Sequence, residues 1–262
     1  MKRYSLIFSF LFSCICLYAQ TRISAVSEDP KVVAHRGFWD TEGSAQNSLM
    51  SLDKAAEIYC YGSEFDVNIT EDGYLVVNHD ATINGMVIEE HPYKDIADVK
   101  LKNGETLPTL YQYLQRAKDW PEIRLILEIK THKLPENEDK AVDGVVTLVK
   151  NMGLLDRTEF ISFSLEVCKR LHKQLPESKV AYLNGDLSPM EVKKLGLTGI
   201  DYHYDVFNKH PEWLDEAYQN GIEVNVWTVD KLDLLQKFSN DSRVNLITTN
   251  KPLALQGLKN KK

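Results

Sequence analysis

The sequence is poor in the residues that mark disordered or cysteine-stabilised chains. It has nine Pro and thirteen Gly among 262 residues, and it contains no low-complexity tract or internal repeat, so nothing favours disorder or a repeat architecture. Only four cysteines occur, and two of them, Cys14 and Cys16, lie near the N-terminus. The other two, Cys60 and Cys168, could form a disulfide or remain buried thiols, and we assign neither a chemical role.

The chain also has fewer basic than acidic residues. The chain has 31 Lys and Arg against 38 Asp and Glu, which gives a net charge of -7 at pH 7. A polyanion such as nucleic acid is therefore disfavoured as a partner. The hydrophobic fraction of 43% is enough to bury a full core, so we expect one globular domain.

The first twenty residues, "MKRYSLIFSFLFSCICLYAQ", differ from the rest. Two basic residues precede a short apolar stretch and then Ala19, which is the order of a secretory signal and too short to favour a membrane span. We therefore predict a signal peptide over residues 1–19, a linker over 20–30 and a periplasmic or secreted protein with no stable membrane insertion. Lipid attachment at Cys14 is the less favoured alternative, because Phe12 suits that signal poorly.

After residue 30, short β-rich runs alternate with amphipathic stretches. The predicted parallel strands are 31–35, 63–68, 124–130, 158–163, 179–183, 199–203, 223–229 and 244–248. The predicted helices are 47–60, 108–119, 138–152, 165–174, 189–195, 211–220, 231–239 and 252–259. Ser188 before Pro189, and Asp230 before Lys231, resemble helix caps. Eight such units over residues 31–262 predict an α/β fold, a (β/α)8 TIM-type barrel, with an open doubly wound sheet as the alternative.

One further strand departs from this order. Asp72-Gly73 is a strong hairpin turn signal, and it lies between the second strand and "LVVNH" at 75–79. We therefore predict a β-hairpin insertion after the second barrel strand, which brings His79 beside Glu64 and Asp66. Residues 80–107 are predicted to be a loop excursion with one short helix.

Chemically versatile residues stand where the predicted strands end, and in a barrel those ends converge on one rim. Glu64 and Asp66 share a face of one strand, and Glu128 projects from the next parallel strand. Three converging carboxylates repel unless they are protonated or neutralised by a hard divalent cation. The simpler alternative for an isolated Glu-x-Asp pair is a set of exposed acids paired with lysines.

Histidine and basic residues end the same strands. His35 and His79 can transfer protons near neutral pH, although a lone histidine at a strand end is often only a structural hydrogen-bonding group. Arg36 and Lys130 are cationic donors suited to an anion.

The segment "VVAHRGFWDTEGSAQNSLMSLDKAAEIYCYGSEFDVNITEDGYLVVNHD" resembles the glycerophosphodiester phosphodiesterase family, and so do "LPTLYQYL", "LILEIK", "ISFS", "VNVWTV" and "LITTNKP". The resemblance implies an α/β barrel, a divalent metal such as Mg or Ca, and hydrolysis of a small-molecule phosphodiester to an alcohol and a phosphomonoester. It assigns metal binding to Glu64, Asp66 and Glu128, acid-base roles to His35 and His79, and phosphate contact to Arg36 and Lys130.

One position departs from the family pattern, and two aromatic features fit it loosely. The family usually has an acid where this chain has Gln46, which removes a charge near the site. Trp227 is a candidate wall for the pocket that holds the alcohol. Phe38 and Trp39 fit that role or simple packing equally well.

We expect an exported, metal-dependent hydrolase of glycerophosphodiesters that uses two-histidine acid-base catalysis. A barrel enzyme for another phospholipid or envelope-polymer diester is the alternative of the same class. A phosphate-binding relative without turnover is the alternative of another class, and Gln46 is the feature that favours it.

Overall fold

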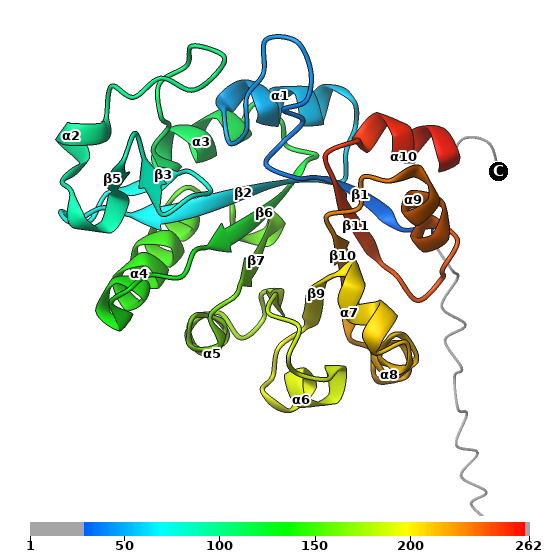
Figure 1. Ribbon diagram of the computed structural model, residues 1–262. Coiled ribbons are helices and arrows are strands. Elements are labelled where there is room, and N and C mark those ends of the chain that lie inside the picture. The colour runs from blue at the N-terminus through cyan, green and yellow to red at the C-terminus, as the bar shows by residue number, and fades with distance from the viewer. Residues whose placement is uncertain (1–28, 260–262) are drawn as a thin grey trace, which may run out of the picture.

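The eight predicted strands all form, and they close into a ring. The computed structural model describes residues 29–259, and it is a closed parallel barrel whose strands are surrounded by helices (Figure 1). The barrel strands are β1 (Lys31–Ala34), β2 (Gly62–Ile69), β6 (Arg124–Ile129), β7 (Thr158–Ser162), β8 (Val180–Tyr182), β9 (Gly199–His203), β10 (Glu223–Trp227) and β11 (Leu246–Thr249). The pairing of β1 with both β11 and β2 closes the ring and excludes the open sheet.

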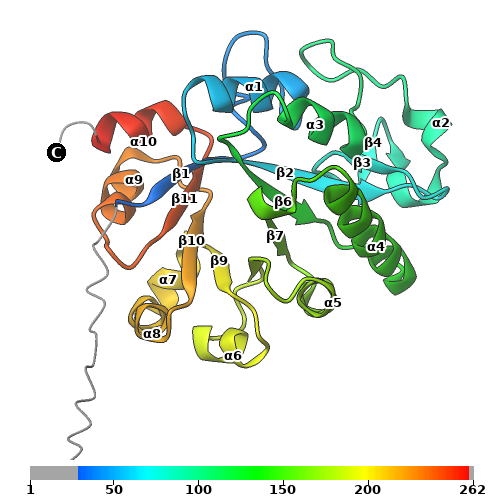
Figure 2. The same ribbon diagram turned by 180° about the vertical axis from the view of Figure 1, so that it is seen from behind.

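Each predicted helix is present within a few residues of its expected bounds. The helices around the barrel are α1 (Leu49–Glu57), α3 (Leu110–Ala117), α4 (Pro135–Asn151), α5 (Leu165–Gln174), α6 (Pro189–Lys194), α7 (Tyr204–Lys209), α8 (Glu212–Asn220), α9 (Leu232–Ser239) and α10 (Pro252–Lys259). Of these, α7 was not predicted. The helix starts follow local chemistry, since Thr109 with Gln112 and Ser188 with Glu191 each form a capping box. Figure 2 shows the last helix, α10, beside α9 and β1.

Side chains alternate between the two faces of every barrel strand. Phe65 and Val67 of β2, with Leu127 of β6, belong to the large apolar cluster beneath the helices. Their sequence neighbours Glu64, Asp66 and Glu128 therefore point into the barrel, and all three are buried. The alternation thus places the polar residues of several strands inside one ring.

The β-hairpin insertion forms as predicted. β3 (Leu75–Val77) runs antiparallel to β2, with Val67 opposite Val77, and Asn78 continues the ladder by donating its backbone N–H to Asp66 at 3.0 Å. This register returns the chain to the rim, so that the next residue, His79, reaches the level of the carboxylates.

The region between the hairpin and α3 is a small excursion with its own packing. It contains β4 (Thr82–Ile83), β5 (Met86–Val87), a 3-10 turn (Ile88–Glu90) and one short helix, α2 (Tyr93–Ile96). Val76, Ile88, Ile96 and Leu107 form a separate apolar cluster there. The predicted short helix is therefore present, and the two-residue strands β4 and β5 were not foreseen.

The structure decides the roles of Asp230 and of the two cysteines. The prediction that Asp230 caps the following helix is wrong, because α9 begins at Leu232 after Lys231 and the Asp230 carboxylate instead accepts hydrogen bonds from Asn250. Cys60 and Cys168 are buried free thiols, and burial raises the pKa of each to about 12. The alternative of unreactive thiols is therefore the correct one.

The predicted signal peptide and Cys14 lie outside the described residues, so export stays a prediction. Within residues 29–259, no helix combines the length and apolar character that crossing a membrane requires.

The tight turn after β1 leaves no room for a side chain at Gly37, so substitutions there should destabilise the protein. Gly37 has a φ of +74°, and a Cβ there would lie 2.3 Å from Ser51 Oγ and 2.7 Å from the Ser51 backbone carbon. Gly73 has a φ of +88° with no atom within 4 Å of such a Cβ. Gly73→Ala should lower the free energy of unfolding by about 1 kcal/mol from backbone strain alone, and Gly37→Ala by about 3 kcal/mol or more. Denaturant unfolding of both variants measures this difference, and equal losses would contradict the packing argument.

Candidate active site

A pocket of about 120 Å³ opens at the carboxyl-terminal rim of the barrel. It has a charged side and an apolar side, because strand-end acids and bases face the interior beside aromatic and aliphatic groups. Its lining residues are His35, Arg36, Glu64, His79, Glu128, Ile161, Phe163, Leu183, Asp201, Trp227, Thr228 and Thr248. We call this space the rim pocket.

Glu64, Asp66 and Glu128 form a carboxylate cluster at the charged side. β2 and β6 pair in parallel with Asp66 opposite Glu128, and one carboxylate oxygen from each of the three residues lies within 4.8 Å of the others. Only 3%, 1% and 6% of Glu64, Asp66 and Glu128 are exposed. The prediction that they converge is therefore correct, and the alternative of exposed surface acids is not.

Burial and mutual repulsion oppose the simultaneous ionisation of the three carboxyl groups. Burial raises the pKa of Glu64 well above its usual value, and the charges of Asp66 and Glu128 add to the effect. Burial and Asp66 likewise raise the pKa of Glu128 to about 8. Burial alone would also raise the pKa of Asp66, but Lys130 and other neighbours hold it below the usual value. The cluster thus lacks enough positive charge for three carboxylates.

Lys130 and Arg36 supply the positive charge that is present. Lys130 Nζ lies 2.8 Å from Glu128 Oε1 and 3.2 Å from Asp66 Oδ1. Arg36 donates its backbone N–H to Glu64 Oε2 at 2.7 Å, and its Nε lies 3.8 Å from Asp66 Oδ2. Arg36 also lines the rim pocket, whereas Lys130 is occupied by the carboxylates.

Asn47 is a member of the site that sequence reasoning did not select. Its Nδ2 donates to Asp66 Oδ2 at 2.8 Å, and its Oδ1 accepts from the Asp66 backbone N–H at 3.2 Å. The side chain is buried and the residue has a φ of +60°. Asn47 therefore fixes the rotamer of Asp66. The signal for it was its place in the segment "AQNS" that opens the first helix.

Gln46 retains a contact with the site. Its Oε1 accepts a hydrogen bond of 2.8 Å from Arg36 Nη1. The amide thus orients the guanidinium as an acid could, but it leaves the charge of Arg36 uncompensated on that edge.

His35 follows β1, and its ring is held from one side. His35 Nδ1 lies 2.9 Å from Asn250 Oδ1, just after β11. Burial, followed by the charge of Arg36, lowers the pKa of His35 to about 4. The imidazole is therefore neutral at physiological pH and can accept a proton.

His79 lies across the rim pocket on the chain that leaves the hairpin. Its Nδ1 lies 2.7 Å from Asp80 Oδ1, and 38% of its side chain is exposed. This ring, unlike that of His35, therefore has a carboxylate as its partner.

Aromatic rings form the apolar side. Phe163 and Trp227 meet edge to face, with ring centroids 5.6 Å apart, and both line the rim pocket. Trp227 is held by its indole N–H, which donates to the Asp201 carbonyl oxygen at 2.8 Å. Phe38 instead packs in the main core, and Trp39 does not line the rim pocket. Packing is therefore the correct interpretation of Phe38.

Asp201 lies on the floor of the rim pocket and was not selected from the sequence. Asn225 Nδ2 donates to its Oδ2 at 3.0 Å, while its Oδ1 has no hydrogen-bond partner. Burial raises the pKa of Asp201 to about 8. A neutral carboxylic acid in this position can donate as well as accept a hydrogen bond.

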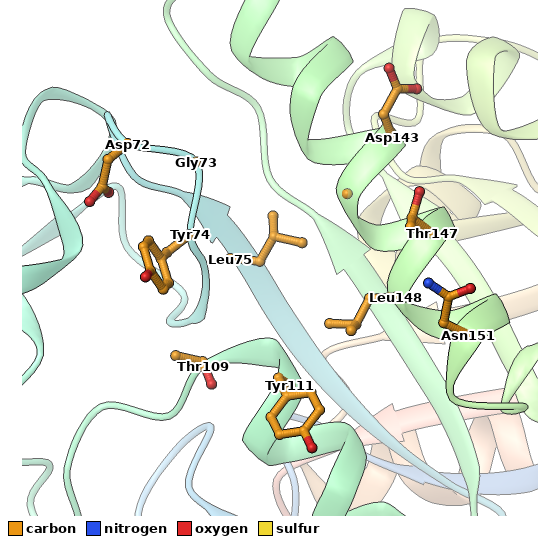
Figure 3. A pocket seen from close by; sticks show the side chains of 11 residues that line it. Asp72, Gly73, Tyr74, Leu75, Thr109, Tyr111, Asp143, Thr147, Leu148 and Asn151 are labelled. Carbon is orange, nitrogen blue, oxygen red and sulfur yellow. The ribbon is translucent and has the colours of Figure 1, made fainter.

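A larger cavity of about 730 Å³ lies on the outer surface. Figure 3 shows it between the hairpin residues Tyr74 and Leu75, Tyr111 of α3, and Leu148 of α4. It contains none of the rim residues, so its size does not make it the site of the chemistry.

Known proteins match this chain in sequence and in fold. The sequence profile of the glycerophosphoryl diester phosphodiesterase family matches residues 35–254. A glycerophosphodiester phosphodiesterase of Caldanaerobacter subterraneus subsp. tengcongensis is 28% identical over 222 residues, covering 79% of this chain and 88% of that protein. The crystal structure of a glycerophosphodiester phosphodiesterase from Parabacteroides distasonis has a TM-score of 0.87 and 49% identity, covering 89% of this chain and 98% of its own. An Oleispira antarctica phosphodiesterase, at 22% identity, 88% and 97% coverage and a TM-score of 0.76, shares the fold.

The buried Asp201 predicts a pH dependence of stability. Burial raises the pKa of Asp201 in the folded protein to about 8, whereas the ordinary pKa of an aspartic acid, as in the unfolded chain, is 3.8. Its contribution to stability is therefore complete below that lower value and is lost as the pH rises through 8. Asp201→Asn removes this loss.

Between pH 5 and pH 8, the free energy of unfolding of the natural protein should fall relative to Asp201→Asn by about 2–4 kcal/mol. Denaturant titrations at the two pH values, in excess chelator, measure the difference. The Asn225 hydrogen bond survives because an asparagine oxygen can still accept it. Parallel pH profiles for the two proteins would show that Asp201 is ionised throughout.

Proposed function

The chain belongs to the glycerophosphoryl diester phosphodiesterase family, and from this premise we propose that the rim pocket hydrolyses glycerophosphodiesters to an alcohol and glycerol phosphate, with a divalent metal and two histidines. The observation that carries the proposal is the rim pocket itself. It combines a buried carboxylate cluster, an arginine, two imidazoles and an aromatic wall in one space. Binding a phosphodiester needs the charged side, and binding its alkyl part needs the apolar side.

The donor set fits a hard divalent cation such as Mg or Ca. Glu64, Asp66 and Glu128 offer only oxygen ligands, and the raised pKa values of the two glutamic acids come from burial and then from the repulsion of neighbouring carboxylates, which a cation would relieve. The chemistry that such a cation supplies when bound is stabilisation of the negative charge that develops on phosphoryl oxygens. Asn47 and Lys130 keep Asp66 in place for this role.

The remaining groups act on the substrate directly. Arg36 offers its guanidinium to a phosphoryl oxygen, with Gln46 holding its orientation. One histidine removes a proton from the nucleophile and the other protonates the leaving alkoxide, and each has one nitrogen tied to a neighbour and one available. Phe163 and Trp227 exclude water from the side where the alkyl part of the substrate lies.

A structural relative supports the product. The Oleispira antarctica phosphodiesterase was crystallised in complex with the product sn-glycerol-3-phosphate. We propose the same class of product here, because the rim pocket joins a cationic side chain and a carboxylate cluster to an apolar wall.

Metal removal tests the carboxylate cluster. Excess chelator should abolish release of phosphomonoester from glycerophosphocholine, and added Mg or Ca should restore it. Saturating metal, at about 100 times the dissociation constant, should stabilise the folded protein by about 2.7 kcal/mol, which raises Tm by roughly 5–10 °C. Differential scanning calorimetry measures this shift without any substrate.

A matched pair of variants locates the metal. Glu128→Gln should remove most of the Tm shift. Glu159→Gln should keep it, because Glu159 is equally buried but bonds Arg124 and Lys179 instead of the cluster. A full metal response in Glu128→Gln, or full activity in chelator, would refute the metal assignment.

Loss of either imidazole tests the acid-base proposal. His35→Ala and His79→Ala should each lower kcat on glycerophosphocholine by about 10²–10⁴-fold with the fold intact. His210→Ala is the control, since His210 stacks on Trp213 outside the rim pocket, and its kcat should stay near the natural value.

A substrate with an activated leaving group separates the two roles. A nitrophenyl phosphodiester hardly needs a proton on its leaving group, so the variant that lacks the general acid should lose much less activity on it than on glycerophosphocholine. The variant that lacks the base should lose activity on both alike. Equal behaviour of the two variants would rule out the division of roles.

A further inference from the structure

Asn250 is the hydrogen-bond partner of His35, and its side-chain amide has a definite orientation. Trp39 Nε1 donates to Asn250 Oδ1 at 2.8 Å. An indole N–H can only donate, so the accepting atom must be the amide oxygen. On the other side, Asn250 Nδ2 donates to Asp230 Oδ2 at 2.7 Å, and a carboxylate only accepts. Two independent contacts therefore exclude the flipped amide.

Asp230 also holds the backbone of Asn250. Its Oδ1 accepts the Asn250 backbone N–H at 2.8 Å and the Thr249 hydroxyl at 3.1 Å. The carboxylate thus binds both the main chain and the side chain of Asn250. This explains why Asp230, which resembles a helix cap in the sequence, is used elsewhere.

The fixed amide decides which nitrogen of His35 carries the proton. Because Asn250 offers an oxygen at 2.9 Å, His35 Nδ1 must be the donor in the neutral ring. The lone pair is then on Nε2, and the ring lines the rim pocket. We propose that Asn250 is a positioning residue that holds His35 as the Nδ1–H tautomer and leaves Nε2 as the proton acceptor for the reaction.

This inference rests on the proposed function for its catalytic consequence. In a neutral Nδ1–H ring, Nε2 can take a proton but cannot give one, which assigns His35 to the nucleophile side of the reaction. Asn250 is also uncharged, whereas the partner of His79 is the carboxylate of Asp80. The two histidines of one pocket thus have partners of different charge.

The tautomer is tested first in the unsubstituted protein. Two-bond ¹H–¹⁵N correlation spectra of ¹⁵N-histidine-labelled protein distinguish the two neutral tautomers, and the spectrum of His35→Gln identifies the resonances of His35. We expect the Nδ1–H pattern at neutral pH. An Nε2–H pattern would overturn the proposal, whether or not any variant of Asn250 folds.

Asn250→Leu removes the acceptor at similar size. It should lose the pure Nδ1–H pattern and lower kcat by about 10- to 10²-fold, with KM little changed because Asn250 does not line the rim pocket. Trp39→Phe is the control, since Asp230 still orients the amide, and it should keep the Nδ1–H pattern. Retention of the pattern or of full kcat in Asn250→Leu would overturn the role of Asn250.

A double variant that exchanges Asn250 and Asp230 tests whether the acceptor lost in Asn250→Leu can be restored. In the double variant Asn250→Asp with Asp230→Asn, a carboxylate at 250 accepts from both rings. The side-chain bond between 250 and 230 is kept with its direction reversed, since the amide at 230 now donates it, and the amide oxygen at 230 still accepts the backbone N–H of 250. This variant should restore the Nδ1–H pattern and recover kcat to within a few-fold. Failure of the rescue in a folded double variant would count against the proposal.

The spectroscopic and kinetic results separate the two hypotheses. The Nδ1–H pattern, and its loss in Asn250→Leu, can be read in a protein that hydrolyses nothing. If the pattern behaves as expected but the natural protein releases no phosphomonoester from any glycerophosphodiester, the proposed function fails and the control of the tautomer by Asn250 stands.

Discussion

Three carboxylates buried side by side are the constraint on which the rest of the site depends. The parallel register that places Asp66 opposite Glu128, with Glu64 on the same face of β2, brings like charges together in a place with little water. Such an arrangement is unfavourable unless positive charge compensates it. Lys130 lies against two of the three carboxylates and Arg36 binds the third through its backbone. The neighbouring residues are thus committed to the cluster before any substrate is considered.

The turn after β1 serves the same constraint. For Arg36 to donate its backbone N–H to Glu64, the chain must turn sharply, and Arg36 and Gly37 both have positive φ values. The space beside Gly37 is filled by Ser51 of α1, so only glycine fits. Each residue of the His-Arg-Gly sequence therefore has its own physical reason: an imidazole that lines the rim pocket, a cation whose main chain binds the cluster, and a residue without a side chain.

The contrast between the two histidines comes from their neighbours and not from their own positions. Both end segments that reach the rim, yet the ring of His35 lies next to a neutral amide while that of His79 lies next to a carboxylate. Phe163 and Trp227 form the apolar side of the rim pocket. A pocket of about 120 Å³ therefore has charged groups on one side and aromatic rings on the other. A diester with a charged centre and an uncharged arm matches that division.

The sequence by itself determined the eight barrel strands, most of the helices, the hairpin and the chemistry of the strand ends, because alternation, capping and turn signals are local and the order of strands fixes which rim they share. It also selected the carboxylates, both histidines and Arg36, which the fold brings together at the rim pocket. It did not identify Asn47 and Asn250, and it assigned Asp230 to a helix cap. Those roles depend on contacts between Asn47 and Asp66, 19 positions apart, and between His35 and Asn250, 215 positions apart. Only closure of the barrel brings β1 next to β11, so the tertiary structure alone decided which amide faces which ring.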